Sequence, residues 1–312
     1  MVQDITTNIG SVRNSGFEFA LNTTNKLGPI DWNTSVNFAT LKNQVLDLGA
    51  NGAGGRNEYP GLTGVFQTSG ENMTITREGS PISAFYGYEV EGIFGNEEEA
   101  FSHARPSWWT GNPLNRPTAG DVKYKDQNGD GLIDANDRKI LGNPLPDWYG
   151  GMQNTFGYRG FSLDVFLNWQ VGNEIYNYAK QSVDRGDGFG NHTKEFYDTH
   201  WRQDRPGTTH PRAAGAMPYH NAERVSSRWV EDGSFLRVRT ISLAYDLNQL
   251  VKITGMTRSR LYVSVANAFT FTRYTGYDPE VSSVSQNSLA QGVDLGGHPN
   301  ARIYTVGLNL GF

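Results

Sequence analysis

The chain has 312 residues, enough for one large or two ordinary domains, and a net charge of -5. Its 27 Lys and Arg residues are scattered, which argues against a nucleic-acid partner. No run of about 18 apolar residues occurs, so no membrane-spanning helix is expected. There is no cysteine, which excludes disulfides and thiol chemistry. The start, Met1 to Asp4, lacks the basic and apolar character of a secretory leader, so an exported protein of this sequence would be a fragment.

Alternation of apolar and other residues predicts a β-hairpin near the start of the chain. Phe17, Phe19 and Leu21 alternate with smaller or polar residues, and after a turn at 26–29 the apolar residues take the even positions of 30–38. Both strands therefore have one oily face. Weaker or shorter strands are expected near residues 73–75 and 85–94, and a short helix over 97–103.

Longer strands follow in the middle of the chain. Residues 152–158 and 161–169 alternate strongly, and only Arg159 and Gly160 separate them, which predicts a tight hairpin. In residues 235–247 the apolar positions change from even to odd, and a bulge near Arg239 and Thr240 would reconcile the two halves. The alternative is that one half lies beyond the bilayer, where alternation need not hold. Arg237 and Arg239 should then point into a lumen, since an arginine facing lipid costs about 2 to 4 kcal/mol at the bilayer midplane.

The last twelve residues, 301–312, form the clearest strand. One parity is apolar and ends on an aromatic, with Tyr304, Val306, Leu308, Leu310 and Phe312. The other parity is small or polar, which suits an outer-membrane barrel with a lipid face and a lumen face. The sequence therefore predicts an all-β fold, the C-terminal portion of an antiparallel transmembrane β-barrel with long extracellular loops. Roughly ten strands are expected, too few to close a barrel of about 22 strands alone.

An acidic loop of twelve residues resembles a calcium-binding loop. Hard oxygen donors stand at the spacing of calcium ligands, and a glycine allows the sharp bend between them. The predicted ligands are Asp126, Asn128, Asp130, the backbone carbonyl of Leu132, and Asp137. Asp137 departs from the pattern, because the EF-hand has a bidentate glutamate there. The alternative is an Asp and Asn turn that needs no ion; the register favours calcium.

Residues 178–228 are polar and aperiodic and predict a long extracellular loop. His200, His210 and His220 are ten residues apart, a spacing that does not favour a zinc site. The Arg-Gly-Asp triplet at 185–187 is too short a signal to establish an adhesin.

Several ordered blocks resemble the SusC/RagA-type TonB-linked outer-membrane proteins. They are residues 120–176, which contain KYKDQNGDGLID and GNEIYN, residues 229–245 with EDGSFLR, residues 261–279, and the tail at 292–312. The resemblance covers nearly the whole chain as one unit, residues 1–312, and is to the C-terminal part of such a protein. The family's signal peptide, TonB box, plug and N-terminal strands have no counterpart in these blocks.

The resemblance implies a role in transport. It implies uptake of oligosaccharides or peptides across the bacterial outer membrane, with a SusD-like surface lipoprotein as partner and TonB engaged through the N-terminal part. The strand ending at Phe312 would be the contact for the barrel-assembly machinery. The chain has neither an HExxH nor a GxSxG motif, and we expect no enzymatic activity.

A second hypothesis is a secreted, calcium-stabilised β-sandwich that binds glycans. It accounts for the acidic loop and the aromatic residues, but less well for alternation that persists to the terminal Phe312.

Overall fold

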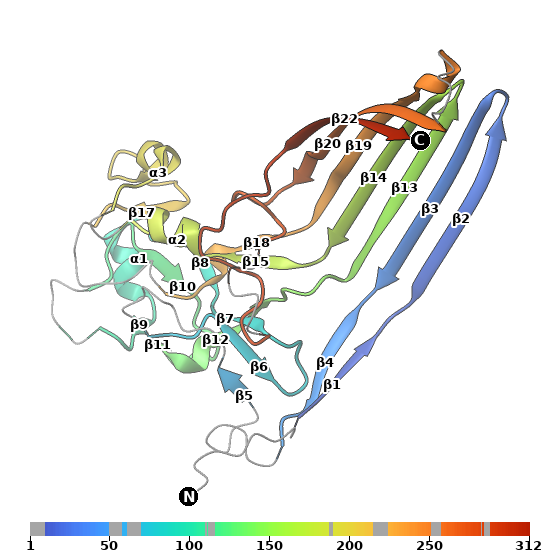
Figure 1. Ribbon diagram of the computed structural model, residues 1–312. Helices are drawn as coiled ribbons and strands as arrows, with labels where there is room; N and C mark the ends of the chain where they lie inside the picture. Colours follow the sequence, from blue (N-terminus) through green and yellow to red (C-terminus); the bar gives the residue numbers. More distant parts are fainter. Residues whose placement is uncertain are drawn as a thin grey trace, which may run out of the picture.

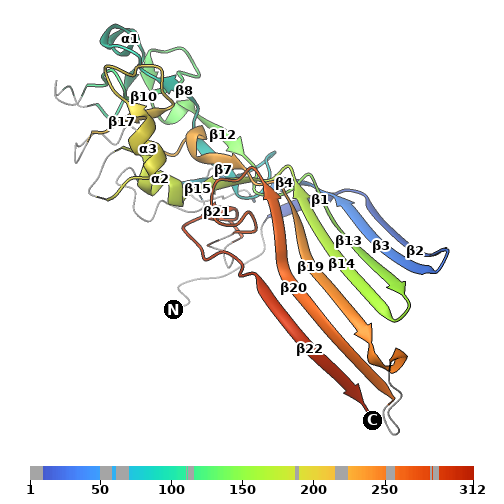
Figure 2. The same ribbon diagram turned by 90° about the horizontal axis from the view of Figure 1, so that it is seen from above.

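The computed structural model describes residues 10–49, 58–60, 70–109, 111, 116–186, 190–214, 224–250, 257–281, 283 and 288–312. It consists of one sheet of long strands and a module of short strands and helices at one end of that sheet (Figures 1 and 2). Among the described residues, no helix is both long and apolar enough to cross a membrane.

The long strands form one seven-stranded sheet in the order β2-β3-β13-β14-β19-β20-β22, and all neighbours are antiparallel. This open, antiparallel sheet of long strands agrees with the expected partial barrel. Its strands are β2 (Glu18–Leu27), β3 (Ile30–Thr40), β13 (Trp148–Tyr158), β14 (Phe161–Val171), β19 (Phe235–Asp246), β20 (Arg258–Thr272) and β22 (Ile303–Gly311).

Short turns join the strands at one end of the sheet only. Arg159 and Gly160 link β13 to β14 with φ angles of 46° and 85°. Positive φ at both central residues is the type I′ geometry that matches the twist of a hairpin. At the opposite end the chain leaves the sheet for the module between β3 and β13 and again between β14 and β19 (Figure 1). The predicted asymmetry of short turns and long connections is confirmed.

Register places apolar side chains in rows across one face. One row joins Val306, Val263, Leu243, Leu163 and Phe156 on five successive strands. Val306 is 75% exposed, Val263 46% and Leu243 43%. A continuous apolar face that no part of the described chain covers is what a lipid-facing barrel wall presents.

The bulge expected in residues 235–247 is present. Val238 and Thr240 of β19 pair with Leu167 and Phe166 of β14, so Arg239 is the extra residue. On the next strand, Asn267 has a φ of 52° at the same place. The bulge keeps the apolar residues on one face through the change of parity.

The module contains the remaining elements. Its four-stranded sheet has the order β12-β7-β6-β5, its three-stranded sheet has the order β18-β15-β21, and three short pairs complete it. The antiparallel pair of β1 and β4 continues the hairpin of β2 and β3 beyond the main sheet. The strands are β1 (Ser11–Ser15), β4 (Lys42–Asp47), β5 (Glu58–Pro60), β6 (Thr74–Arg77), β7 (Ala84–Tyr88), β8 (Val90–Ile93), β9 (Arg105–Pro106), β10 (Val122–Tyr124), β11 (Leu132–Ile133), β12 (Arg138–Gly142), β15 (Glu174–Asn177), β16 (His200–Trp201), β17 (His210–Arg212), β18 (Val230–Asp232) and β21 (Val293–Asp294).

The helices are α1 (Glu97–Ser102), α2 (Tyr178–Asp184) and α3 (Lys194–Thr199). The first confirms the predicted helix over 97–103. The other two fall in the stretch 178–228 that was expected to be irregular. α2 has seven residues and α3 has six, so each is about two turns long at most. Each begins at a side-chain cap, Asn177 for α2 and Thr193 for α3. Helices this short do not produce a detectable hydrophobic period.

The module has its own hydrophobic core. Residues from distant parts of the chain meet in it, namely Met73, Phe85, Tyr176, Tyr178, Val225, Trp229 and Val293. All are at most 4% exposed, so the module is a packed body rather than a set of independent loops.

Gly307 on the closing strand provides a test of the sheet's packing. It pairs with Tyr262, and a Cβ at this position would lie 2.3 Å from the tyrosine Cζ. We expect Gly307→Val to destabilise the folded sheet by about 1 to 3 kcal/mol, because the ring must leave its site. Heat-modifiable migration of the full polypeptide on a denaturing gel measures the folded fraction. Thr305→Val, on the same strand and face, is the control, and an equal effect of both changes would contradict this packing role.

Candidate functional site

The face opposite the apolar rows is polar. One of its rows joins Asn37, Gly151, Asn168, Arg237 and Thr270 on neighbouring strands. Another row places Asp164 between Thr155 and Ser242, and the Thr155 hydroxyl donates to the Asp164 carboxylate at 2.6 Å. We call this side the inner face, because it is the side that a barrel turns toward its lumen.

A cluster of four charged residues lies on the inner face. Arg237 is 2% exposed and contacts Asp278 at 2.5 Å and Glu280 at 2.6 Å. Arg239 also reaches Glu280, at 2.8 Å. Both arginines point inward, as the sequence predicted, and both have carboxylate partners that reduce the cost of their burial.

The two carboxylates come from the connection between β20 and β22, so the cluster holds this connection against the sheet. Residues 278–280 are named the clasp below. Asp278 also accepts hydrogen bonds from the backbone N–H and side-chain amide of Asn300, at 3.0 and 2.9 Å. Burial opposes ionisation of Asp278, but hydrogen bonds from the Glu280 N–H, Arg237 and Asn300 keep its pKa below the ordinary value.

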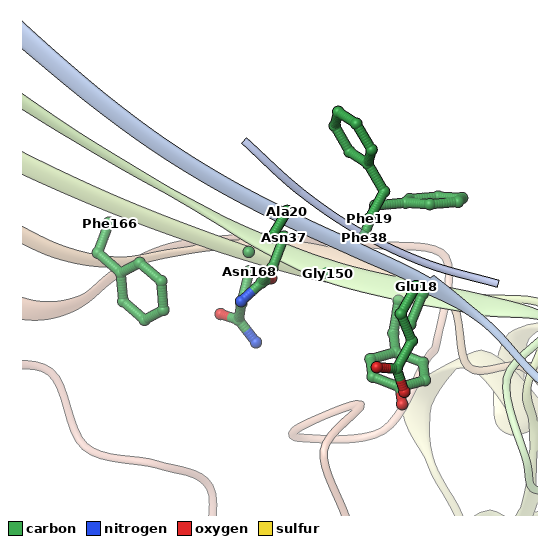
Figure 3. A pocket seen from close by; sticks show the side chains of 11 residues that line it. Glu18, Phe19, Ala20, Asn37, Phe38, Gly150, Phe166 and Asn168 are labelled. Carbon is green, nitrogen blue, oxygen red and sulfur yellow. The ribbon is translucent and has the colours of Figure 1, made fainter. Parts of the chain in front are cut away.

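A hollow of about 520 Å³ lies beside the clasp on the inner face (Figure 3). Glu18, Asn37, Tyr149, Phe166 and Asn168 contribute side chains to its wall. In Figure 3, Phe166 and Asn168 lie on one side of the strands and Phe19 and Phe38 on the other. Asn168 also donates to Glu280 at 3.4 Å, so the hollow and the clasp share this residue.

The acidic loop 126–137 belongs to the module and is held by its own backbone. Asp126 accepts hydrogen bonds from the N–H groups of Gly129 and Gly131, at 2.7 and 2.9 Å. The bond from Gly131 is the main cause of a lowered pKa of Asp126, since it stabilises the carboxylate. Asn128 and Asp130 accept from the N–H groups two residues further on.

Asp137, the last predicted ligand, is fully buried. Its two oxygens accept from the N–H groups of Gln127 and Asp134, at 2.8 and 2.7 Å. Among the described residues, no group of three or more His, Cys, Asp or Glu is arranged to hold a metal ion. The hard oxygens of the loop have the chemistry that calcium prefers, but hydrogen bonds account for the observed contacts of Asp137. Calcium binding by Asp126, Asn128, Asp130, Leu132 and Asp137 stays a prediction.

Two of the three spaced histidines meet in the module. His200 pairs with His210 in a two-stranded bridge, and both rings contact Phe196. Burial is the main cause of a lowered pKa of His210. His220 lies outside the described residues, as does Asp187 of the Arg-Gly-Asp triplet.

No protein-family model matches the chain. The chain is, however, 34% identical over 98% of its length to TonB-dependent receptor P3 of Formosa agariphila, of which it covers 29%. It is also 25% identical over 99% of its length to TonB-dependent receptor SusC of Bacteroides thetaiotaomicron, covering 27% of that protein.

Nearly the whole chain is therefore similar to a part of the TonB-dependent receptors, SusC among them. Its fold is similar to a solved structure of the RagAB peptide transporter, with a TM-score of 0.72 and 21% sequence identity. That match covers 97% of this chain and 29% of the solved chain. The chain thus spans less than a third of the receptors that it matches. The partial barrel is confirmed, and this fold differs from the β-sandwich of the alternative hypothesis.

Arg237 provides a test of the clasp. Arg237→Ala leaves Asp278 and Glu280 without their buried partner, and we expect a loss of about 3 to 5 kcal/mol in local stability. Limited proteolysis of the connection between β20 and β22 measures the change. Arg239→Ala is the control, because its side chain is 35% exposed and its pair is worth about 1 kcal/mol or less. Equal protease sensitivity of the two variants would contradict the role given to Arg237.

The acidic loop has a separate test. If calcium binds there, Asp126→Ala combined with Asp130→Ala removes two of the oxygen donors and should abolish calcium-dependent protection of residues 126–137 from protease. The double variant is compared with the unchanged protein in calcium and in chelator. Protection that is the same in all these conditions would show that the loop is stabilised by its hydrogen bonds alone.

Proposed function

We propose that this chain forms part of the barrel wall of an energy-dependent importer in the bacterial outer membrane. The observation that carries the proposal is the division of one seven-stranded sheet into an exposed apolar face and a polar inner face. Similarity to TonB-dependent receptors supports it, since in such a barrel the apolar face meets lipid and the inner face meets the lumen.

We infer that the cargo is an oligosaccharide or a peptide. The solved relative is described as a peptide transporter, and the curated relatives include SusC. In this chain the inner face offers amides, hydroxyls and aromatic rings for hydrogen bonding and packing to such chains. No catalytic motif contributes to the proposal, and an enzymatic activity is not part of it.

The module points to a partner at the mouth of the barrel. It lies at the end of the sheet where the long connections are, opposite the tight turns, which is the extracellular end in outer-membrane barrels. Tyr197 and Tyr277 in this part are 75% and 77% exposed. Exposed tyrosines of this kind are enriched in protein interfaces, and we propose a SusD-like surface lipoprotein as the partner. TonB and the barrel-assembly machinery are proposed partners of the complete receptor.

The proposal predicts loss of uptake when the full polypeptide is removed. Cells that lack it should no longer accumulate one class of fluorescent oligosaccharide or peptide, because a cargo too large to diffuse through porins needs its importer. Dissipating the proton gradient should abolish the same uptake in unchanged cells, since TonB-linked import needs energy.

The control is uptake of a small solute that enters by diffusion, which should stay the same in all strains. Unchanged accumulation of every oligosaccharide and peptide in the deletion strain would overturn the transport proposal. Co-purification of a surface lipoprotein with the tagged polypeptide tests the proposed partner separately.

A further inference from the structure

Two adjacent glycines of β13, Gly150 and Gly151, line the hollow on the inner face. Gly150 faces the apolar side, where a Cβ would lie 2.6 Å from Cζ2 of Trp169. Gly151 faces inward, where a Cβ would lie 3.3 Å from both Asn37 Oδ1 and Phe166 Cε2. The first glycine therefore makes room for an aromatic ring of the protein itself. The second lets an amide and an aromatic ring approach the strand closely on the lumen side.

The wall of this space combines two kinds of group. Asn37 and Asn168 stand on either side of Gly151 in register. The Asn168 amide donates to Glu280 of the clasp and its Oδ1 is buried, so Asn37 is the amide whose donors and acceptor face a ligand. Phe166 and Tyr149 add aromatic surface on either side of this row, and Tyr149 is 42% exposed. The volume, about 520 Å³, lies within the range of roughly 300 to 1,000 Å³ that is usual for ligand pockets.

The charged residues around the hollow restrict the class of ligand that can bind there. Among the described residues that line the hollow, Glu18 alone is charged. The nearest arginines on the polar face, Arg237 and Arg239, already contact Asp278 and Glu280 of the clasp. An anionic ligand would therefore meet a carboxylate and no unpaired cation of the wall, which is unfavourable in a partly desolvated site.

We propose that the hollow over Gly151 is a binding subsite for neutral carbohydrate chains, and that Glu18 selects against anionic ones. This deepens and rests on the proposed transport function. The Asn37 amide matches the paired donor and acceptor of neighbouring sugar hydroxyls. The aromatic rings pack against the apolar faces of sugar rings, and the Glu18 carboxylate accepts from a further hydroxyl. A uronate or sulfated sugar would place its negative charge beside Glu18.

Filling the hollow is the direct test. Gly151→Val in the purified full polypeptide should raise the Kd for a neutral hexasaccharide about tenfold, because the new side chain pushes Asn37 and Phe166 from their places in the wall of the hollow. Gly157→Val is a matched control on the same strand and face. Its Cβ would lie 3.7 Å from the nearest atom, Asp31 Cβ, so it should leave the Kd unchanged. Calorimetry with neutral hexasaccharides of glucose, mannose, xylose and galactose provides the measurement.

A second variant keeps the test independent of backbone effects at Gly151. Tyr149→Ala removes a partly exposed ring without filling any space, and it should also weaken neutral-sugar binding about fivefold or more. Heat-modifiable migration of each variant confirms that its barrel is folded. If folded Gly151→Val and Tyr149→Ala both bind neutral hexasaccharides as tightly as the unchanged protein, or if the unchanged protein binds none, the proposal is overturned.

The selective role of Glu18 is tested by a substitution that removes only its charge. Glu18→Gln should increase the affinity for a hexauronate about tenfold while changing that for the neutral hexasaccharide little, since only the anion gains from loss of the charge. No gain for the hexauronate would overturn the selective role of Glu18. Failure of the sugar site is distinguishable from failure of the proposed function. A receptor that still imports peptides in an energy-dependent way would remain an importer without this carbohydrate subsite.

Discussion

Antiparallel register is the constraint on which the rest of this structure depends. Each residue of a strand faces the side opposite to its neighbours, so a slip of one residue would turn every apolar side chain of that strand from lipid toward the lumen. The bulge at Arg239 shows how strictly this holds. The chain absorbs one extra residue there, and the apolar rows continue across the strands on both sides of it. The extra residue carries a charge that the clasp binds, so the irregularity also helps to anchor the clasp.

The clasp links the two parts of the molecule. Residues 278–280 are bonded to the sheet through Arg237, and the same connection continues into the module. There, β21 pairs with β15, and the Leu289 carbonyl accepts a hydrogen bond from the Thr74 hydroxyl at 2.7 Å. A buried ion pair contributes little net stability when it replaces apolar packing, but breaking it is costly. Its role here is geometric, because it fixes the path of a long connection against the wall.

The sequence predicted the long strands well, because their side chains repeat a period of two over nine residues or more. It also predicted the bulge and the inward direction of both arginines. The change of parity in residues 235–247 indicated the bulge, and the cost of placing an arginine in lipid indicated the direction.

The sequence did not predict α2 and α3, which are capped but too short for a helical period. Nor did it find the clasp. Asp278 and Glu280 pair with Arg237 and Arg239 across about forty residues, and no local pattern indicates such a contact. The acidic loop was found from spacing alone, yet its hydrogen bonds suit either a calcium site or a turn without an ion.

The hollow was missed for a related reason. Gly150 and Gly151 both interrupt the alternation of β13, and a sequence pattern treats them as two equivalent gaps in a strand. Register with β3 and β14 separates them. On the lipid side, the ring of Trp169 fills the gap at Gly150, so the apolar surface stays continuous. On the inner side, Asn37, Asn168 and Phe166 surround the gap at Gly151, and the neighbouring cations are already paired with the clasp. Gly151 thus belongs to a hollow whose lining carries one carboxylate, Glu18, and no cation among the described residues. The clasp pairs with the neighbouring arginines, so it also influences which ligands the hollow can accept.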